Sequence, residues 1–251
     1  MKRLSTGING LDDLIEGGLP EHSATLISGT AGAGKTIFGL QYICQGAIKN
    51  NERGVLITFE QTDHKLQEQA MQFGWDIEKL ISEDKIKLIS ITKYSIGETF
   101  SQLQTLLKDY KPKRLVIDSI TYIDLYAHAL NRLVDLESTP QEEMIHGTKA
   151  SQTPMEWDQL IIRKIIVDLI KMLQNDDVTT IITSELSEDS QWYSRDTISE
   201  FVCDAVILLK SVTLGKDLQR TLEVKKMRGT KIKGGMRNFE FTKKGIEVKA
   251  D

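Results

Sequence analysis

One stretch of the chain has the residue types and spacing that could bind phosphate groups. Residues 29–36 read Gly-Thr-Ala-Gly-Ala-Gly-Lys-Thr and match G-x-x-x-x-G-K-[ST], the Walker A pattern, at every required position. Glycines let successive N–H groups point into one hollow, and the helix that follows adds the positive end of its dipole. The predicted nucleotide-binding residues are Gly29, Thr30, Ala31, Gly32, Ala33, Gly34, Lys35, Thr36 and Ile37.

Three side chains would supply charge and metal ligands to that site. Lys35 offers a mobile positive charge for the outer phosphates, and the Thr36 hydroxyl is a ligand that suits Mg²⁺. Residues 114–118 read Arg-Leu-Val-Ile-Asp, the Walker B pattern, in which Asp118 ends a strand and is expected to hold Mg²⁺ through a water. An Asp at a strand end is more often a helix cap, but its place after a Walker A motif favours the metal role.

The elements that must position these residues alternate along the chain. Apolar strands are predicted at 24–28, 54–59, 86–91, 114–118 and 178–184, with amphipathic helices between them, and the apolar spacing of residues 8–15 predicts a short helix. Short strands joined by glycines follow at 205–210, 220–226, 238–241 and 246–248. We therefore expect an α/β fold: a mostly parallel twisted sheet with helices on both faces and an antiparallel extension at the C-terminus.

Length and composition suit one soluble domain over residues 1–251. The net charge of −4 does not favour nucleic acid or an anionic membrane as a partner, and the chain has neither a signal peptide nor an apolar run long enough for a membrane span. A cytoplasmic location and buried, unpaired thiols at Cys44 and Cys203 are expected. Residues 124–157 are acidic and interrupted by prolines, which predicts an inserted surface segment, either a solvated insertion or an arm that binds an unidentified protein partner.

Taken together and in order, the motifs resemble the KaiC-like branch of the RecA/RadA-fold ATPases. The resemblance covers nearly the whole chain apart from 124–157, and it implies ATP and ADP as ligands, Mg²⁺ as cofactor and a homo-oligomer. The relatives with a clock role have two such domains, so neither the clock nor the autokinase activity is carried over. The matching segments are 4–12, 17–20, 29–36, 59–60, 116–119, 183–185, 201–204 and 226–230.

The resemblance also implies roles for single residues. Glu60 matches the carboxylate that polarises the attacking water, but the second glutamate of many relatives is Gln61 here, which predicts slow hydrolysis. Ser184 and Glu185 match the position that senses the γ-phosphate. In ring-forming relatives, residues matching Lys226, Arg228 and Thr230 reach the ATP of a neighbouring subunit. Two residues after Thr230, where the family has a histidine, this chain has Ile232. This difference leaves the contact of residues 226–230 with the nucleotide open.

Three functions are compatible with these patterns. The first is an ATPase in which Glu60 directs water at the γ-phosphate. The second is a recombination accessory protein that binds single-stranded DNA, because Trp192, Tyr193 and Arg195 could stack on bases, although acidic neighbours oppose phosphate there. The third is a non-hydrolytic switch in which ATP binding alone orders a partner surface.

Overall fold

The computed structural model describes residues 1–91, 96–122, 154–214 and 217–249. Most of the segment predicted as an insertion, 124–153, lies outside the described residues. Residues 154–157 form the first turn of the long helix α6.

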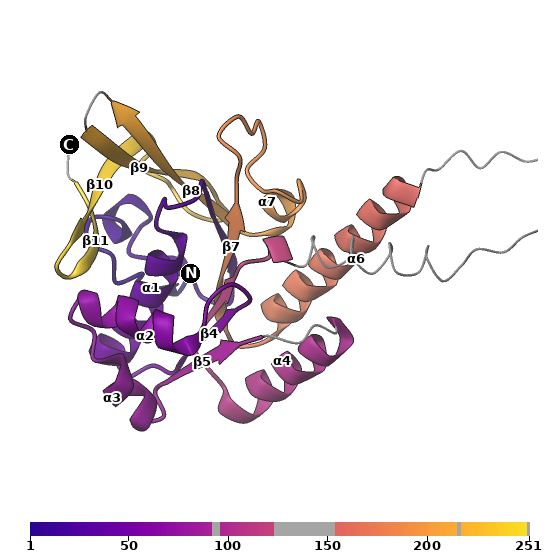
Figure 1. Ribbon diagram of the computed structural model, residues 1–251, viewed down its shortest axis with the longest axis horizontal. Helices are drawn as coiled ribbons and strands as arrows, with labels where there is room; N and C mark the ends of the chain where they lie inside the picture. Colours follow the sequence, from indigo (N-terminus) through magenta and orange to yellow (C-terminus); the bar gives the residue numbers. More distant parts are fainter. Residues whose placement is uncertain (92–95, 123–153, 215–216, 250–251) are drawn as a thin grey trace, which may run out of the picture.

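A nine-stranded sheet forms the centre of the molecule, in the order β11-β10-β9-β8-β3-β7-β6-β4-β5 (Figure 1). The strands from β8 to β5 in that order are parallel, and β9, β10 and β11 extend the sheet in antiparallel fashion, which confirms the predicted fold class. A two-stranded β1–β2 pair stands apart. The strands are β1 (Arg3–Leu4), β2 (Leu19–Pro20), β3 (Ala24–Gly29), β4 (Gly54–Thr58), β5 (Ile86–Ser90), β6 (Arg114–Asp118), β7 (Thr179–Glu185), β8 (Ala205–Leu214), β9 (Asp217–Met227), β10 (Met236–Thr242) and β11 (Gly245–Val248).

Helices cover both faces of this sheet. In Figure 1, α1, α2 and α3 lie on one side of the strands, and α4 and α6 lie on the other. Each face has its own buried core, because alternate residues of the same strands point to opposite sides, as Leu56 and Ile57 do. The helices are the 3₁₀ turn η1 (Asp12–Leu14), α1 (Lys35–Asn50), α2 (Asp63–Gln72), α3 (Ile77–Ser82), α4 (Ile96–Tyr110), α6 (Pro154–Asn175) and α7 (Ser199–Val202).

Two segments differ in extent from the sequence-based expectation. The helix expected over residues 8–15 is only the 3₁₀ turn η1, where Asp12 instead accepts hydrogen bonds from Ser5 and Thr6. The strands β8 and β9 run well beyond the predicted 205–210 and 220–226. Their pairing reaches Leu214 and Asp217, so backbone hydrogen bonding continues past the end of the apolar pattern.

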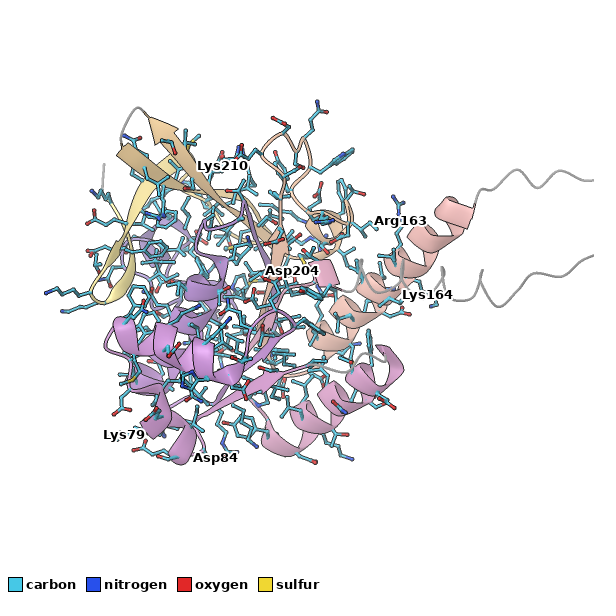
Figure 2. All side chains as sticks on the ribbon, viewed as in Figure 1. Lys79, Asp84, Arg163, Lys164, Asp204 and Lys210 are labelled. Carbon is cyan, nitrogen blue, oxygen red and sulfur yellow. The ribbon has the colours of Figure 1, made fainter. Side chains whose placement is uncertain are left out.

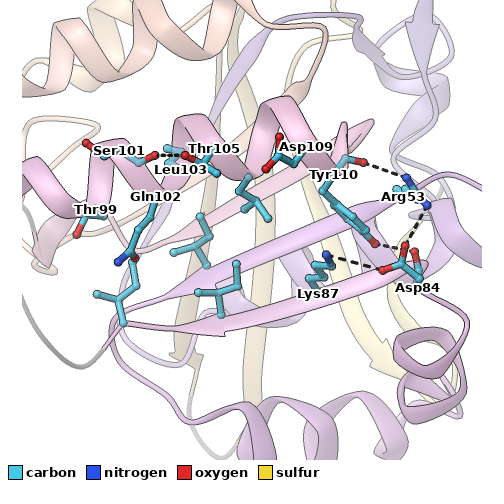
Figure 3. Close-up of a pocket in the computed structure, with 14 residues that line it drawn as sticks. Arg53, Asp84, Lys87, Thr99, Ser101, Gln102, Leu103, Thr105, Asp109 and Tyr110 are labelled. Atoms are coloured by element: carbon cyan, nitrogen blue, oxygen red, sulfur yellow. Dashed lines mark hydrogen bonds and ion pairs between the residues drawn. The ribbon is translucent and has the colours of Figure 1, made fainter.

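A groove between α4 and β5 is closed at one end by paired charges (Figure 3). Tyr110 at the end of α4 donates its hydroxyl to the Asp84 carbonyl at 2.9 Å, and Lys87 lies over its ring at 4.0 Å. Arg53 donates to the Tyr110 carbonyl and pairs with the Asp84 carboxylate at 2.9 Å. This network ties the end of α4 to the edge of the sheet.

Charged side chains such as Lys79 and Lys164 project from the periphery of the molecule (Figure 2). Both cysteines, Cys44 and Cys203, are buried free thiols, as predicted. Among the described residues, every helix is too short or too polar to cross a bilayer.

Candidate active site

The predicted phosphate-binding loop, residues 29–36, connects β3 to α1 at the carboxyl edge of the parallel strands. Gly32 and Gly34 adopt positive φ angles of 72° and 103°, in the region that favours glycine. Gly34 precedes the first residue of α1 and provides no side-chain cap. The first N–H groups of a helix have no partner within it, so this end of α1 is suited to an anion. The backbone therefore fits a phosphate group.

Lys35 points back into the loop. Its Nζ donates to the carbonyl oxygens of Gly29 and Thr30 at 2.9 and 3.0 Å, and the Glu185 carboxylate lies 3.9 Å away. Burial lowers the pKa of Lys35, whereas the negative charges of Glu185, Asp118 and Glu60 raise it. The ammonium group is thus held at the mouth of the loop by three oxygens.

The predicted metal ligands lie next to each other. Thr36 Oγ1 donates to Asp118 Oδ2 at 2.8 Å, and Thr183 Oγ1 donates to Asp118 Oδ1 at 2.5 Å. Burial raises the pKa of Asp118, and the two hydroxyl donors oppose that shift. A hydroxyl and a carboxylate side by side are the hard oxygen donors that Mg²⁺ uses when phosphates and waters complete its shell. These residues therefore fit the metal that the motifs predict.

Glu60 follows the end of β4 and lies beside the Walker B strand. The Thr58 hydroxyl accepts hydrogen bonds from the N–H groups of Glu60 and Gln61 at 3.2 and 3.3 Å, which turns the chain there. Ser119 Oγ donates to Glu60 Oε1 at 2.7 Å. Burial raises the pKa of Glu60, and the Ser119 hydrogen bond lowers it. The Gln61 side chain instead accepts from Gln69 at 2.8 Å.

The predicted γ-phosphate sensors face different surroundings. The Glu185 carboxylate lies near Lys35, and the backbone N–H of Glu185 donates to Thr121 Oγ1 at 3.0 Å. The buried Ser184 hydroxyl accepts from the N–H of Arg195 at 3.2 Å. Ser28, on β3, donates to the Tyr193 carbonyl. Ser184 and Ser28 therefore hold the loop after β7, and Glu185 lies close to the predicted phosphate site; the sensing role of Ser184 and Glu185 stays a prediction.

Three predicted interface residues lie near the amino ends of the parallel strands, away from the phosphate loop: Lys226, Arg228 and Thr230. Lys226 pairs with Val206 near the start of β8, whereas Gly29 pairs with Leu209 further along that strand. Lys226 Nζ donates to the carbonyls of Glu200, Phe201 and Cys203 at 2.7–3.1 Å. Arg228 pairs with Asp204 at 3.2 Å, and Thr230 accepts from Arg3 at 2.7 Å. The structure does not bring these three residues to the phosphate loop of their own chain.

The loop on which the DNA-binding alternative rests exposes its aromatic rings but not all of its polar groups. The exposed fractions of Trp192 and Tyr193 are 53% and 39%. The Tyr193 N–H donates to Glu200 at 2.7 Å. Binding of single-stranded DNA at this loop stays a hypothesis.

Sequence reasoning did not single out Thr183 or Ser119 as site residues. Thr183 contacts Asp118 from the neighbouring strand, and Ser119 contacts Glu60 from 59 positions away in the sequence. A signal for Ser119 was its place directly after the Walker B aspartate.

Comparisons with known proteins identify the family of this chain. The family model described as "ATPase: KaiC" matches residues 4–134 and 151–251. The circadian clock oscillator protein KaiC of one Prochlorococcus marinus strain is 32% identical over 99% of this chain, and that of Synechococcus elongatus is 30% identical over 98%. The chain spans 46% and 44% of those two relatives.

A solved structure matches over nearly its full length. It is a KaiC-like protein from the hyperthermophilic archaeon Pyrococcus horikoshii OT3, with a TM-score of 0.79 and 31% identity over 99% of both chains. The expected resemblance is confirmed by these matches, and the chain belongs to the KaiC family of ATPases.

Proposed function

We propose that this chain binds Mg-ATP at residues 29–37 and hydrolyses it, with Glu60 orienting the attacking water. The observation that supports this most is that two side-chain contacts lie next to each other at the carboxyl edge of the sheet. Thr36 contacts Asp118, and the next residue along, Ser119, contacts Glu60. A metal-binding pair and a water-orienting carboxylate are the parts that phosphoryl transfer to water needs beside a phosphate cradle.

Each residue has a separate task in this proposal. Backbone N–H groups of residues 30–36 bind the phosphate oxygens, and Lys35 moves from the loop carbonyls to the outer phosphates. Glu60, in its charged form, accepts a hydrogen bond from the water that attacks the γ-phosphorus. Thr36 would hold Mg²⁺ directly and Asp118 would hold it through a water, and the bound metal would supply positive charge to the phosphate oxygens. Glu185, which lies near Lys35, and Ser184, which contacts the following loop, sense the γ-phosphate.

The second part of the proposal is a shared site in a homo-oligomer. Lys226, Arg228 and Thr230 would act at the ATP of a neighbouring subunit, where a cation supplied in trans stabilises the charge of the transition state. Two observations support this. The two cations lie near the edge of the sheet opposite the phosphate loop of their own chain. Arg228 is also largely accessible, because its side chain is 56% exposed.

The central experiment compares two lysine variants of the same helix. Lys35→Ala removes the buried ammonium group at the phosphate loop, and Lys49→Ala removes an exposed one in the last turn of α1. We expect Lys35→Ala to weaken ATP binding about a hundredfold or more and to abolish phosphate release, because it removes a charge-assisted contact with the phosphates. Lys49→Ala should match the original protein. Hydrolysis by Lys35→Ala at the original rate would show that the site is assigned wrongly.

A further inference from the structure

We propose that Ser119 is a positioning residue that orients the Glu60 carboxylate toward the attacking water, an inference that rests on the proposed function. Ser119 Oγ donates to Glu60 Oε1 at 2.7 Å, and the Ser119 side chain is fully buried. Glu60 comes from the end of β4 and Ser119 from the end of β6, so this contact joins two neighbouring strands at the carboxyl edge of the sheet.

The backbone around Ser119 is fixed from both sides. The Phe59 N–H donates to the Asp118 carbonyl at 3.0 Å, which ties the end of β4 to β6. The Ile120 N–H donates to the Thr183 carbonyl at 2.9 Å, which ties the following residue to β7. The serine between these two anchors is therefore a donor at a defined place, and a partly exposed carboxylate such as that of Glu60 gains orientation from such a donor.

The hydrogen bond from Ser119 to one carboxylate oxygen of Glu60 affects what the other oxygen can do. The hydrogen bond from Ser119 to Oε1 restricts rotation of the carboxylate. Oε2, for which the described residues show no hydrogen-bond donor, can then accept a hydrogen bond from water. The donor also stabilises the charged form of Glu60, which is the form that can accept a proton from that water. Burial raises the pKa of Glu60, and the Ser119 hydrogen bond lowers it. The hydrogen bond therefore increases the fraction of Glu60 that is charged at a given pH.

The same contact could instead hold Glu60 away from the water. The two interpretations predict opposite results when the hydroxyl is removed. A positioning serine makes hydrolysis slower without it, and a restraining serine makes hydrolysis faster. The geometry favours positioning, because Ser119 directly follows Asp118, whose carboxylate contacts Thr36 of the phosphate loop at 2.8 Å. The carboxylate that contacts Thr36 and the hydroxyl that contacts Glu60 thus come from two adjacent residues, Asp118 and Ser119.

The test compares Ser119→Ala with Ser23→Ala in the full chain. Ser23 is also a buried serine, and it donates to the Pro20 carbonyl at 2.6 Å, away from the site. We expect Ser119→Ala to lower kcat about ten- to a hundredfold with little change in ATP affinity, the effect of losing one hydrogen bond to a charged group. The acid limb of the pH profile of kcat should also move to higher pH. Ser23→Ala should show neither change.

A second comparison separates positioning from a general structural effect. In a Glu60→Gln background, Ser119→Ala should produce no further loss of kcat, because the serine acts only through the carboxylate. An unchanged or faster Ser119→Ala protein, an unmoved acid limb or an additive loss in the double variant would overturn the inference while leaving the ATPase intact. If the unmodified chain neither binds nor hydrolyses ATP, the proposed function fails first, and this inference fails with it.

Discussion

Gly46→Ala provides a demanding test of how the phosphate-loop helix packs on the Walker B strand. A Cβ atom at Gly46 would lie 2.0 Å from Nε of Arg114, the first residue of β6. Arg114 is only 1% exposed, lies over the Tyr42 ring and pairs with Glu52 at 2.6 Å. Its Nη1 also donates to the carbonyls of Ser5 and Tyr42. The guanidinium group has no room to move without losing several of these contacts.

The expected loss follows from two opposing effects. Breaking a buried ion pair costs about 3–5 kcal/mol, and replacing glycine with alanine inside a helix returns about 1 kcal/mol. The net destabilisation is therefore about 2–4 kcal/mol. For a chain of this length, each kcal/mol lowers the melting temperature by about 2–4 °C, so a decrease of about 4–16 °C is expected.

Thermal unfolding, followed by circular dichroism, measures this effect. The matched control is Gly97→Ala in α4, where a Cβ atom would have, among the described residues, no neighbour within 4 Å outside its own helix. That variant should be neutral or slightly stabilised, since alanine favours the helix. If Gly46→Ala were as stable as Gly97→Ala, the Arg114 network would not have the rigidity inferred from its contacts.

Three further results are expected. Glu60→Gln should lower kcat by about 10²- to 10⁴-fold while ATP affinity is retained. In the unmodified protein, kcat should fall as the pH falls through the pKa of Glu60, which burial raises above its ordinary value. A kcat that does not change at acid pH would exclude Glu60 as the proton acceptor. Asp118→Asn should weaken Mg²⁺ binding yet stabilise the metal-free protein near neutral pH. Burial raises the pKa of Asp118 and so disfavours its charged form in the folded state. A lower melting temperature of the metal-free variant would contradict this. Mixing Arg228→Ala subunits with Glu60→Gln subunits should restore hydrolysis that neither shows alone, and phosphate release from the mixture that stays at background would refute a shared site.

The local part of the site could be predicted from the sequence because its determinants are close together in the chain. The phosphate loop needs glycines and a lysine within eight positions, and the structure gives Gly32 and Gly34 the positive φ angles that this loop requires. Strand positions followed from apolar runs, and the parallel sheet followed from their alternation with helices.

Contacts between distant residues could not be predicted in the same way. Thr183 and Ser184 are adjacent, but successive strand residues point to opposite faces, so Thr183 contacts Asp118 whereas Ser184 contacts the loop after β7. Motif matching cannot tell which face of the sheet a strand residue points to, so it did not select Thr183, and the sensing role of Ser184 stays a prediction. The contact of Ser119 with Glu60 likewise depends on β6 lying beside β4, which only the strand order reveals.

The position of Lys226 and Arg228 is the strongest physical reason to expect an oligomer. Lys226 is in register with Val206, and the phosphate loop begins opposite Leu209, three residues further along β8. At about 3.3 Å per residue, the two positions are about 10 Å apart along the strand. Lys226 also points away from the loop, since its three hydrogen-bond acceptors lie at residues 200–203, before β8 begins. Among the described residues, Lys35 is the cation whose contacts place it in the phosphate loop, and the shared-site proposal takes a second cation from another subunit. A monomeric protein with full activity would mean that Lys226 and Arg228 only tie α7 to β9.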